Sequence, residues 1–435
     1  FRAHILNIDR PVGGVGVASL IVGGGESLRG SLWIQGSKNA ALPMIAAAVL
    51  NRGITKIYHC PAISDVDNML EIMKSLGCCI ERTGEYVLID SSQMDVRDIS
   101  PEYAASMRSS VFLMGALLGR FGEVSLPYPG GCVIGKRPID MHLAAFERMN
   151  IRVQVTGDRI FCSTDHMAGS GHRLRYPSVG ATENIILASV LAPGQTVIKN
   201  AAKEPEVIEL CLLLNKMGAD IHGMGTGNIT IYGVSTLHDA VFSLVSDRIV
   251  AATYLAAAAA TAGDVEVRGV WAHDLKTVLQ VLAEMGCGII VRNKRVRVIG
   301  PYMLSCVDSI YTHPFPGFPT DMQSQIMACL SRARGISRLT ETVFEDRFKT
   351  AGELKKMGAD ILIENHTAVI RGVECLKGTC VKAWDLRGTA ALVIAGLMAE
   401  GDTVISDSIY IRRGYEDICA DLKKLGARIE ERKTG

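Results

Sequence analysis

Leu214-Asn215-Lys216-Met217-Gly218-Ala219-Asp220-Ile221 joins the end of a charged amphipathic helix, a glycine and the start of a strand. A glycine or an asparagine at this point suits a left-handed helix C-cap. The pattern occurs five more times, with its capping residue at the following positions: Gly77, Asn150, Gly286, Gly358 and Gly426. Successive caps are 73, 68, 68, 72 and 68 residues apart. This spacing indicates six copies of one structural unit of about 70 residues.

A second pattern lies between these caps. It is a run of small apolar residues, then a glycine, then a strand, as in Ala46–Gly53 and Ile186–Gly194. The other copies are Met114–Gly122, Ala256–Gly263, Met327–Gly335 and Ile394–Gly401. These helices are apolar on nearly every side, so we expect them to be buried. The predicted fold class is α/β, with six units in two domains and the sheets outside the buried helices.

The repeats also predict the domain boundaries. One three-repeat domain should span residues 38–245 and carry a cysteine loop described below. The other should combine residues 19–37 with residues 246–435, so the chain crosses between domains twice. Residues 1–18 begin without Met and have no lysine-led apolar segment, and we expect them to be an extension from outside the native frame.

Composition excludes several classes of protein. The chain has 435 residues, of which 48% are hydrophobic and 21% charged, so it can bury large cores. Its net charge is +1 with no long run of one sign, which argues against nucleic-acid binding. No apolar run reaches the roughly 18 residues of a membrane span. The twelve cysteines form no CxxC pair and no zinc-like pattern, which is typical of the reducing cytoplasm.

The segment Leu126–Pro138 is rich in proline and glycine and predicts a loop. It holds Cys132, followed by the cations Lys136 and Arg137. Nearby cations favour the thiolate and lower the pKa of a cysteine. The loop is therefore either a reactive site or a surface turn with an incidental cysteine, and its composition alone does not decide between them.

Other segments carry candidate chemistry. Ser37 precedes a buried helix that begins with Lys38 and Asn39, and a helix N-terminus with a lysine is a natural anion site. A solvated lysine is the alternative. Asp321 follows a rigid proline-rich loop, where it either caps the next helix or acts as a general base. Four arginines near turns of the units suit phosphate or carboxylate binding: Arg108, Arg347, Arg387 and Arg413.

These motifs together carry a family resemblance. The chain resembles the enolpyruvyl transferases over about residues 19–432, and the most specific match is the loop Gly130–Asp140. Further matches are Gly36–Ala40, Phe318–Gln323, Glu341–Glu345 and Arg413–Glu416. The family branch that acts on shikimate 3-phosphate lacks the cysteine loop, so the resemblance is to the branch that acts on UDP-N-acetylglucosamine. It implies a pair of inside-out α/β barrels with the active site in the interdomain cleft.

The resemblance implies a reaction. The enolpyruvyl group of phosphoenolpyruvate passes to the 3-hydroxyl of UDP-N-acetylglucosamine by addition and elimination, and phosphate is released. In the family this is the first committed step of peptidoglycan precursor synthesis. It implies no metal and no cofactor, because cations of the chain bind the substrate anions.

Motif by motif, the resemblance also implies roles. Cys132 matches the proton donor, which forms a covalent adduct and is the target of fosfomycin. Asp321 matches the base, and Lys38 and Arg413 match catalytic cations. The positions matched to substrate binding are Lys38, Asn39, Arg108, Arg137, Pro138, Ile139, Asp140, Met141, Ser178, Val179, Gly180, Asp321, Val343, Arg347, Asp385, Arg387 and Arg413.

Two positions depart from the family pattern. Val250 replaces a usual glutamate, whose loss could weaken an interdomain ion pair, and Tyr176 replaces a usual basic residue beside Arg175. The leading hypothesis has two alternatives, and these departures support only the second of them. One is a transferase that uses another acceptor, such as shikimate 3-phosphate. The other is a weakly active paralogue that binds the UDP-sugar and regulates partners.

We predict that Cys132 is the fast-reacting thiol among the twelve. Mass spectrometry after treatment with fosfomycin and UDP-N-acetylglucosamine should show one adduct, on the peptide that contains Cys132. Cys132→Asp should keep some activity, because a carboxyl can donate a proton, and should resist the drug, because it is a poorer nucleophile. An adduct on another cysteine, or an aspartate variant that stays sensitive, would contradict this role.

Overall fold

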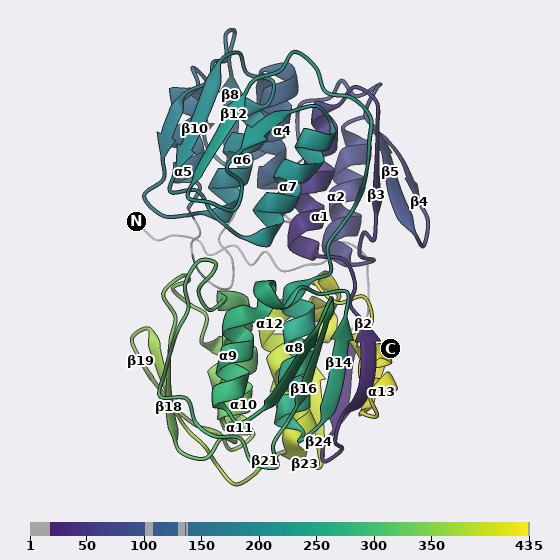
Figure 1. Cartoon of the computed structure of the whole chain (residues 1–435), viewed down its shortest axis with the longest axis vertical. Helices are drawn as coiled ribbons and strands as arrows, with labels where there is room; N and C mark the ends of the chain where they lie inside the picture. The colour runs from purple at the N-terminus through teal and green to yellow at the C-terminus, as the bar shows by residue number, and fades with distance from the viewer. Residues whose placement is uncertain (1–17, 101–107, 129–134, 136–137, 434–435) are drawn as a thin grey trace.

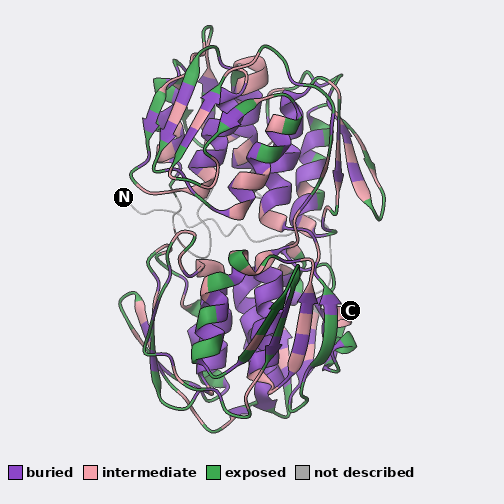
Figure 2. Ribbon diagram, in the orientation of Figure 1, coloured by how far each residue is buried: buried purple, intermediate pink, exposed green. Residues whose placement is uncertain are grey.

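The computed structural model describes residues 18–100, 108–128, 135 and 138–433. They form two lobes, one above the other in Figure 1. Each lobe has its own hydrophobic core. One core is drawn from residues 40–244, and the other from residues 20–34 together with residues 249–429. Figure 2 shows the buried residues concentrated on the helices inside each lobe.

Six helices are buried on most of their surface, as the small apolar runs predicted. They are α1 (Lys38–Ala47), α4 (Phe112–Phe121), α6 (Val179–Ser189), α8 (Arg248–Ala260), α10 (Gln323–Leu330) and α12 (Leu386–Met398). Small residues let these helices approach closely. A Cβ atom on Gly115 of α4 would lie 2.4 Å from the backbone oxygen of Asn184 in α6. Glycine is therefore required where these two helices meet.

The charged amphipathic helices alternate with the buried ones along the described chain. They are α2 (Ser64–Ser75), α5 (Asp140–Arg148), α7 (Pro205–Lys216), α9 (Lys276–Glu284), α11 (Lys349–Lys356) and α13 (Ile418–Lys424). The predicted capping residue after each of them has a positive φ, between 62° and 101°. The C-caps read from the repeat are thus confirmed. Short 3-10 helices are η1 (Ala48–Leu50), η2 (Arg108–Val111), η3 (Ala272–Leu275), η4 (Thr320–Met322) and η5 (Ser408–Arg413).

The sheets of the described chain share one pattern. In each four-stranded sheet the first pair in the orders below is parallel, and the other two pairs are antiparallel. The upper lobe holds β13 (Ala240–Ser243)-β3 (Ile54–Tyr58)-β5 (Tyr86–Asp90)-β4 (Cys79–Arg82) and β9 (Gly171–Arg173)-β10 (Gln195–Lys199)-β12 (Asn228–Tyr232)-β11 (Asp220–His222). It also holds the antiparallel sheet β6 (Glu123–Pro127)-β8 (Arg159–Ser163)-β7 (Arg152–Thr156), which a parallel bridge from Asp98 to Ser125 extends.

The lower lobe holds three sheets of this pattern. They are β2 (Arg29–Trp33)-β14 (Asp264–Arg268)-β16 (Arg295–Ile299)-β15 (Gly288–Arg292), β17 (Ser309–Tyr311)-β18 (Ile336–Thr340)-β20 (Thr367–Arg371)-β19 (Asp360–Glu364) and β22 (Cys380–Lys382)-β24 (Asp402–Ser406)-β1 (Ala18–Gly23)-β25 (Arg428–Lys433). A small parallel pair, β21 (Leu376–Lys377) and β23 (Ala399–Glu400), completes it. The first two strands of the described chain thus lie in the lower lobe (Figure 1). β1 lies between two strands from the end of the chain, β24 and β25, and β2 pairs with β14.

The two crossings between the lobes lie side by side. Gly36 and Ser246 form an isolated antiparallel bridge. The Ser37 N–H donates to the Val245 oxygen at 2.9 Å, and the Asp247 N–H donates to the Gln35 oxygen at 2.8 Å. The lobes are therefore joined by a paired two-strand connection. No helix among the described residues is long and apolar enough to cross a membrane.

The left-handed backbone at the C-cap predicts that alanine substitutions at two glycines, one inside α11 and one just after it, change the stability in opposite directions. Neither Gly358, with φ of 96°, nor Gly352 inside α11 has a neighbour within 4 Å of an added Cβ atom. Gly358→Ala should lower the free energy of unfolding by about 1–2 kcal/mol, because an L-residue is strained there. Gly352→Ala, the matched control, should raise it by about 0.5–1 kcal/mol. Urea denaturation measures both, and equal effects of the two substitutions would contradict the cap.

Candidate functional site

A buried carboxylate ties together two of the predicted cations at the border of the lobes. Asp65, in the first turn of α2, is 2% exposed. Its Oδ2 lies 2.6 Å from Lys38 Nζ, and its Oδ1 accepts a hydrogen bond from Arg413 Nε at 2.9 Å. Lys38 and Asp65 belong to the upper lobe, whereas Arg413 lies in η5 of the lower lobe. The contact therefore spans the border between the lobes.

The electrostatics of this group follow from burial and from its neighbours. Burial alone would raise the pKa of Asp65, but Lys38 and Arg413 outweigh it and lower the pKa. Burial lowers the pKa of Lys38, and the charges of Arg413 and Arg387 lower it further, against the attraction of Asp65. Three cations thus face one another near the start of α1. Such a group favours an incoming anion.

The starts of two helices meet beside these cations. The Ser37 hydroxyl caps α1, as predicted, by accepting from the Ala40 N–H. Asp247 caps α8 by accepting from the N–H groups of Ile249 and Val250, and its second oxygen accepts from the Lys38 N–H at 3.1 Å. Two positive helix ends therefore converge where the chain crosses between the lobes.

Asp321 forms a second charged group in the lower lobe. Its two oxygens accept from Arg347 at 2.8 Å and from Arg387 at 2.9 Å. The arginine side chains are 3% and 6% exposed, whereas that of Asp321 is 27% exposed. Burial alone would raise the pKa of Asp321, but the two guanidinium groups outweigh it and hold the pKa well below its usual range. This carboxylate contacts arginines and provides no helix cap, so the capping alternative is wrong.

Neighbouring residues hold this second group in place. Arg347 also donates to the Thr320 hydroxyl at 2.9 Å, and that hydroxyl donates to the buried Glu341. Glu341 in turn accepts from the Val343 N–H at 2.8 Å. Asp385 caps α12 by accepting from the N–H groups of Arg387 and Gly388. Val343, Arg347, Asp385 and Arg387, four predicted positions, thus share one hydrogen-bonded neighbourhood.

A second ion pair crosses between the lobes. Arg248, of the lower lobe, contacts Glu206 of α7 at 2.9 Å, and both side chains are largely buried. Glu204, beside it, accepts from the Phe315 N–H at 3.1 Å. Val250, one of the departures from the family pattern, is 1% exposed and packs in the lower core. An interlobe ion pair is therefore present in this chain through Arg248.

The remaining predicted positions lie at two helix starts of the upper lobe. Pro138 is exposed, Ile139 is buried, and Asp140 opens α5, followed by Met141. Asp140 pairs with Arg175, the cation beside the second departure, Tyr176. Ser178 caps α6, which begins with Val179 and Gly180. A Cβ atom on Gly180 would lie 3.2 Å from His142 of α5, so the two helix starts are adjacent.

Tyr176 is half-buried at the start of this segment. Burial raises its pKa to about 12, and the charges of Glu204 and Glu341 add to the effect. Glu341, which accepts from the Val343 N–H, thus acts electrostatically on Tyr176 of the other lobe.

Some predicted residues cannot be placed. Cys132 and Arg137 lie outside the described residues, and of Arg108 only its backbone position in η2 is described. Gly135, between the first two, lies against Glu345 of the lower lobe, whose nitrogen would be 3.5 Å from an added Cβ atom.

Among other thiols, burial raises the pKa of Cys211 to about 12 and also raises that of Cys329.

Sequence reasoning missed the residues that organise the predicted ones. These are Asp65, Glu204, Glu206, Arg248 and Glu341. Asp65 had one local signal, its place in the acidic first turn of an amphipathic helix. Nothing local indicates that it faces inward or meets Arg413, which lies 348 residues away in the chain.

Comparisons with known proteins show which family the chain matches. The family model for EPSP synthase (3-phosphoshikimate 1-carboxyvinyltransferase) matches residues 22–422. UDP-N-acetylglucosamine 1-carboxyvinyltransferase 2 of Caldanaerobacter subterraneus is 45% identical over 408 residues, which cover 94% of this chain and 98% of the relative. UDP-N-acetylglucosamine 1-carboxyvinyltransferase 1 of Symbiobacterium thermophilum is 45% identical over 415 residues, with 94% of each covered.

Two solved structures share the fold. The enolpyruvyl transferase NikO from Streptomyces tendae has a TM-score of 0.87 at 24% identity, covering 97% of this chain and 100% of its own. EPSP synthase from Acinetobacter baumannii has a TM-score of 0.77 at 20% identity, covering 96% and 100%.

The burial of Asp65 makes a prediction about stability and pH. Asp65→Asn should lower the free energy of unfolding at pH 7 by roughly 3 kcal/mol, because it leaves two cations without their buried counter-charge. The folded pKa of Asp65 is depressed. Its contribution is therefore present above the unfolded pKa of about 3.9 and is lost as the pH falls toward the folded value.

Urea unfolding at pH 7 and pH 3 measures both effects. The difference between parent and variant should shrink at pH 3, and a difference that is equal at the two pH values would contradict the ion pair. Asp264→Asn is the control, since Asp264 pairs with the exposed Arg297. Its effect at pH 7 should stay below about 1 kcal/mol.

Proposed function

Because the chain belongs to the enolpyruvyl transferase family, we propose that it transfers the enolpyruvyl group of phosphoenolpyruvate to the 3-hydroxyl of UDP-N-acetylglucosamine. The observation that carries this choice of acceptor is 45% identity over 94% of the chain to relatives named for that reaction. The EPSP synthase structure is only 20% identical, so it supports the fold but not shikimate 3-phosphate as acceptor. The product commits the sugar nucleotide to peptidoglycan synthesis.

The charges at the border of the lobes suit these substrates. Phosphoenolpyruvate carries a phosphate and a carboxylate, which are both anionic. Lys38 and Arg413 lie close together, since both pair with the side chain of Asp65. We propose that they bind phosphoenolpyruvate at the start of α1, beside Asn39 and with Arg137. The UDP-sugar would contact the helix starts at residues 138–141 and 178–180, together with Arg108, Val343, Arg347, Asp385 and Arg387. The substrate anions are neutralised by side chains, so the binding requires no metal.

The proposed reaction uses two proton-transferring groups. The oxygen of the sugar 3-hydroxyl attacks C2 of phosphoenolpyruvate while Asp321 accepts the hydroxyl proton. Cys132 gives a proton to C3. The tetrahedral adduct then loses phosphate to form the enol ether, and the cations stabilise the departing anion. Cys132 would also form the covalent adduct with phosphoenolpyruvate and react with fosfomycin.

The contacts of Asp321 constrain its role as a base. A carboxylate held by two arginines is ionised at neutral pH but binds a proton weakly. A base works best with a pKa near the working pH. We propose that the diphosphate of the UDP-sugar draws Arg347 and Arg387 toward itself, which raises the pKa of Asp321 in the complex.

The fold suggests a finer description of the scaffold. We propose two inside-out α/β barrels of three units each, one of residues 38–245 and the other of residues 19–37 with 246–435. The shared sheet pattern and the alternation of buried and amphipathic helices support six units. The active site would lie in the cleft between the barrels. We also propose a cytoplasmic location, since the eleven described cysteines are free thiols.

A phosphate-release assay tests the function. Purified protein with phosphoenolpyruvate should release phosphate when UDP-N-acetylglucosamine is added, and not when shikimate 3-phosphate is added. Release with shikimate 3-phosphate would identify the other acceptor. Binding of the UDP-sugar without release would indicate the regulatory paralogue, and either result would overturn the proposal.

Lys38→Ala should impair turnover far more than folding. A buried charged contact contributes roughly 1.5–3 kcal/mol, so kcat/KM should fall about 10- to 150-fold. The melting temperature should change little, because Asp65 keeps its contact with Arg413. Lys74→Ala, which breaks an exposed pair with Glu71, is the control and should leave both quantities unchanged. A large loss of stability in Lys38→Ala would assign the lysine a structural role.

A further inference from the structure

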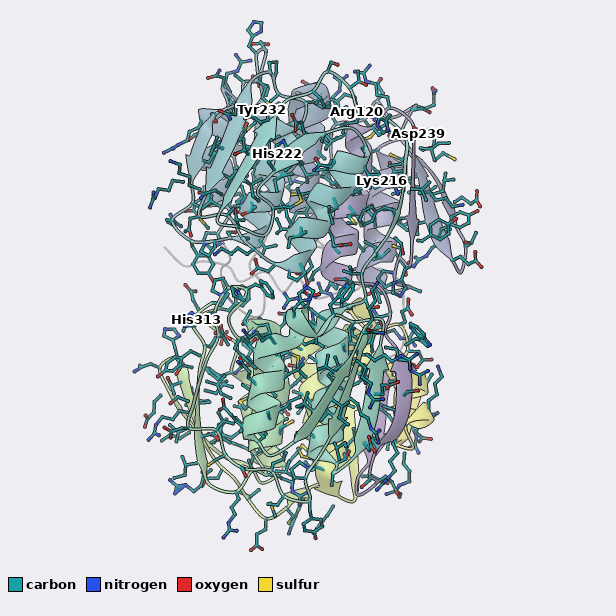
Figure 3. The ribbon with its side chains drawn as sticks, in the orientation of Figure 1. Arg120, Lys216, His222, Tyr232, Asp239 and His313 are labelled. Atoms are coloured by element: carbon teal, nitrogen blue, oxygen red, sulfur yellow. The ribbon has the colours of Figure 1, made fainter. Side chains whose placement is uncertain are left out.

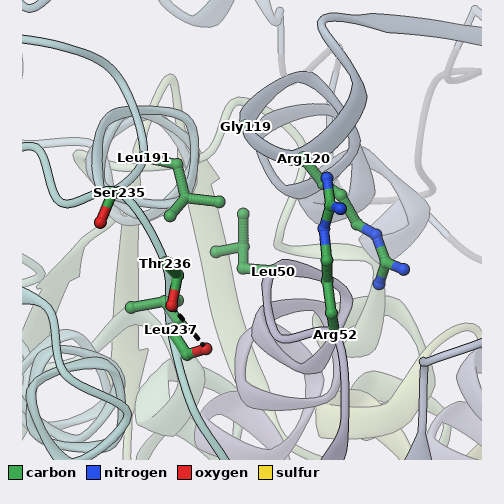
Figure 4. A pocket seen from close by; sticks show the side chains of 8 residues that line it. All are labelled: Leu50, Arg52, Gly119, Arg120, Leu191, Ser235, Thr236 and Leu237. Atoms are coloured by element: carbon green, nitrogen blue, oxygen red, sulfur yellow. Dashed lines mark hydrogen bonds between the residues drawn. The ribbon is translucent and has the colours of Figure 1, made fainter.

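A cavity of about 440 Å³ opens in the upper lobe, away from the border of the lobes. Figure 3 shows one of its lining residues, Arg120, toward the outer end of the upper lobe, whereas His313 lies on the side of the lower lobe that faces the border. The lining residues, drawn in Figure 4, are Leu50, Arg52, Gly119, Arg120, Leu191, Ser235, Thr236 and Leu237. A cavity of this volume suits a small organic ligand.

Two arginines form one wall of the cavity, and they lie side by side in Figure 4. Arg120 is fixed by the backbone: its guanidinium donates to the oxygens of Val49, Asn51 and Ser91 at 2.8–2.9 Å. These acceptors are uncharged, so the positive charge of Arg120 is not neutralised. Its Nε is buried and has no hydrogen-bond partner among the described residues.

Arg52 adds a second positive charge. It is exposed and makes no hydrogen bond or ion pair within the described part of the chain. Burial lowers the pKa of Arg120, and the charge of Arg52 lowers it further. The nearby carboxylate of Asp239 is engaged by the Ile54 N–H at 2.7 Å and by Asn51 at 3.0 Å. Two guanidinium groups held close together without a paired carboxylate favour a bound oxyanion.

The rest of the lining is of a different character. Leu50 and Leu237 are buried and Leu191 is half-buried. Figure 4 shows Leu50 between the arginines and the two hydroxyl residues, with Leu237 beside Thr236. Ser235 and Thr236 are exposed at the opposite side, and both can donate or accept hydrogen bonds. The lining thus offers a cationic end, an apolar middle and a hydroxyl rim.

We propose that this cavity, which we call the outer pocket, binds a small organic oxyanion. Its phosphate or carboxylate would lie between Arg52 and Arg120, and its apolar body against the three leucines. The proposal goes beyond the transferase reaction and does not depend on it. Both kinds of oxyanion share the chemistry that the arginines recognise, so the test includes one of each.

A continuous buried helical segment, which we call the rod, runs from the proposed active site to the outer pocket. α1 begins at Lys38, and η1 continues it to Leu50, which lines the pocket. The rod is about 18 Å long if each of its residues rises by about 1.5 Å. Arg120 contacts the backbone oxygens at the end of this rod. The pocket is therefore a separate site, placed at the opposite end of the helix that carries Lys38.

Two brominated probes test the proposal: 4-bromophenyl phosphate and 4-bromobenzoate. Crystals of the full chain soaked with each probe are examined for the anomalous signal of bromine. We expect a bromine peak among Leu50, Leu191 and Leu237 with at least one of the two probes, and the probe that binds identifies the preferred oxyanion. Peaks only between the lobes, or no peak with either probe, would overturn the proposal.

Variants extend the test to solution. The probe that binds in the crystals is then titrated calorimetrically into the protein. Arg52→Gln should weaken its affinity for the outer pocket at least tenfold. Ser235→Phe, which places a ring at the rim, should weaken this affinity too. Arg292→Gln is the matched control and should bind as the parent does, because Arg292 is an exposed arginine of β15 that forms no ion pair within the described part of the chain. Turnover with saturating substrates should be unchanged in Arg52→Gln. Identical titrations of Arg52→Gln and the parent would contradict the site.

Discussion

The carboxylate of Asp247 is the contact on which the arrangement of the two lobes depends. It is 2% exposed and accepts from three backbone N–H groups, two at the start of α8 and one at the start of α1. One helix belongs to each lobe, so a single side chain fixes the starts of both. Any replacement that cannot accept these bonds would leave buried donors unsatisfied. The Gly36–Ser246 bridge beside it sets the same geometry through the backbone.

Around this junction, the protein balances its cations with its own carboxylates. Asp65 lies between Lys38 and Arg413, and Asp321 lies between Arg347 and Arg387. Without such counter-charges the buried cations would repel one another and oppose folding. An anionic substrate can take over this balance. The ion pairs across the border would then be exchanged for contacts with the ligand, so that binding and the relative position of the lobes are coupled.

The repeat in the sequence predicted most of the scaffold, because it depends on local rules. A C-cap requires glycine or asparagine at one position, and that requirement is readable at Asn150 and at the five glycines. The individual cations of the site were also identifiable, since Lys38, Arg387 and Arg413 stand in motifs. Their partners were not. Asp65 and Glu206 resemble ordinary acidic residues of amphipathic helices, and only the tertiary fold turns them toward a cation. The geometry around Cys132 stays a prediction.

The sheet that pairs β1 with β24 and β25 has a consequence for the order in which the protein is made. Its first strand leaves the ribosome before its two antiparallel partners have been translated, because residues 18–23 pair with residues 402–406 and 428–433. The core drawn from residues 40–244 contains no later segment, so nascent chain can complete it first. Until those partners have been translated, the apolar strand β1 has no neighbour on either side. During that time its unpaired backbone N–H and C=O groups can pair with another strand, so completion of this sheet at the end of synthesis removes an aggregation hazard.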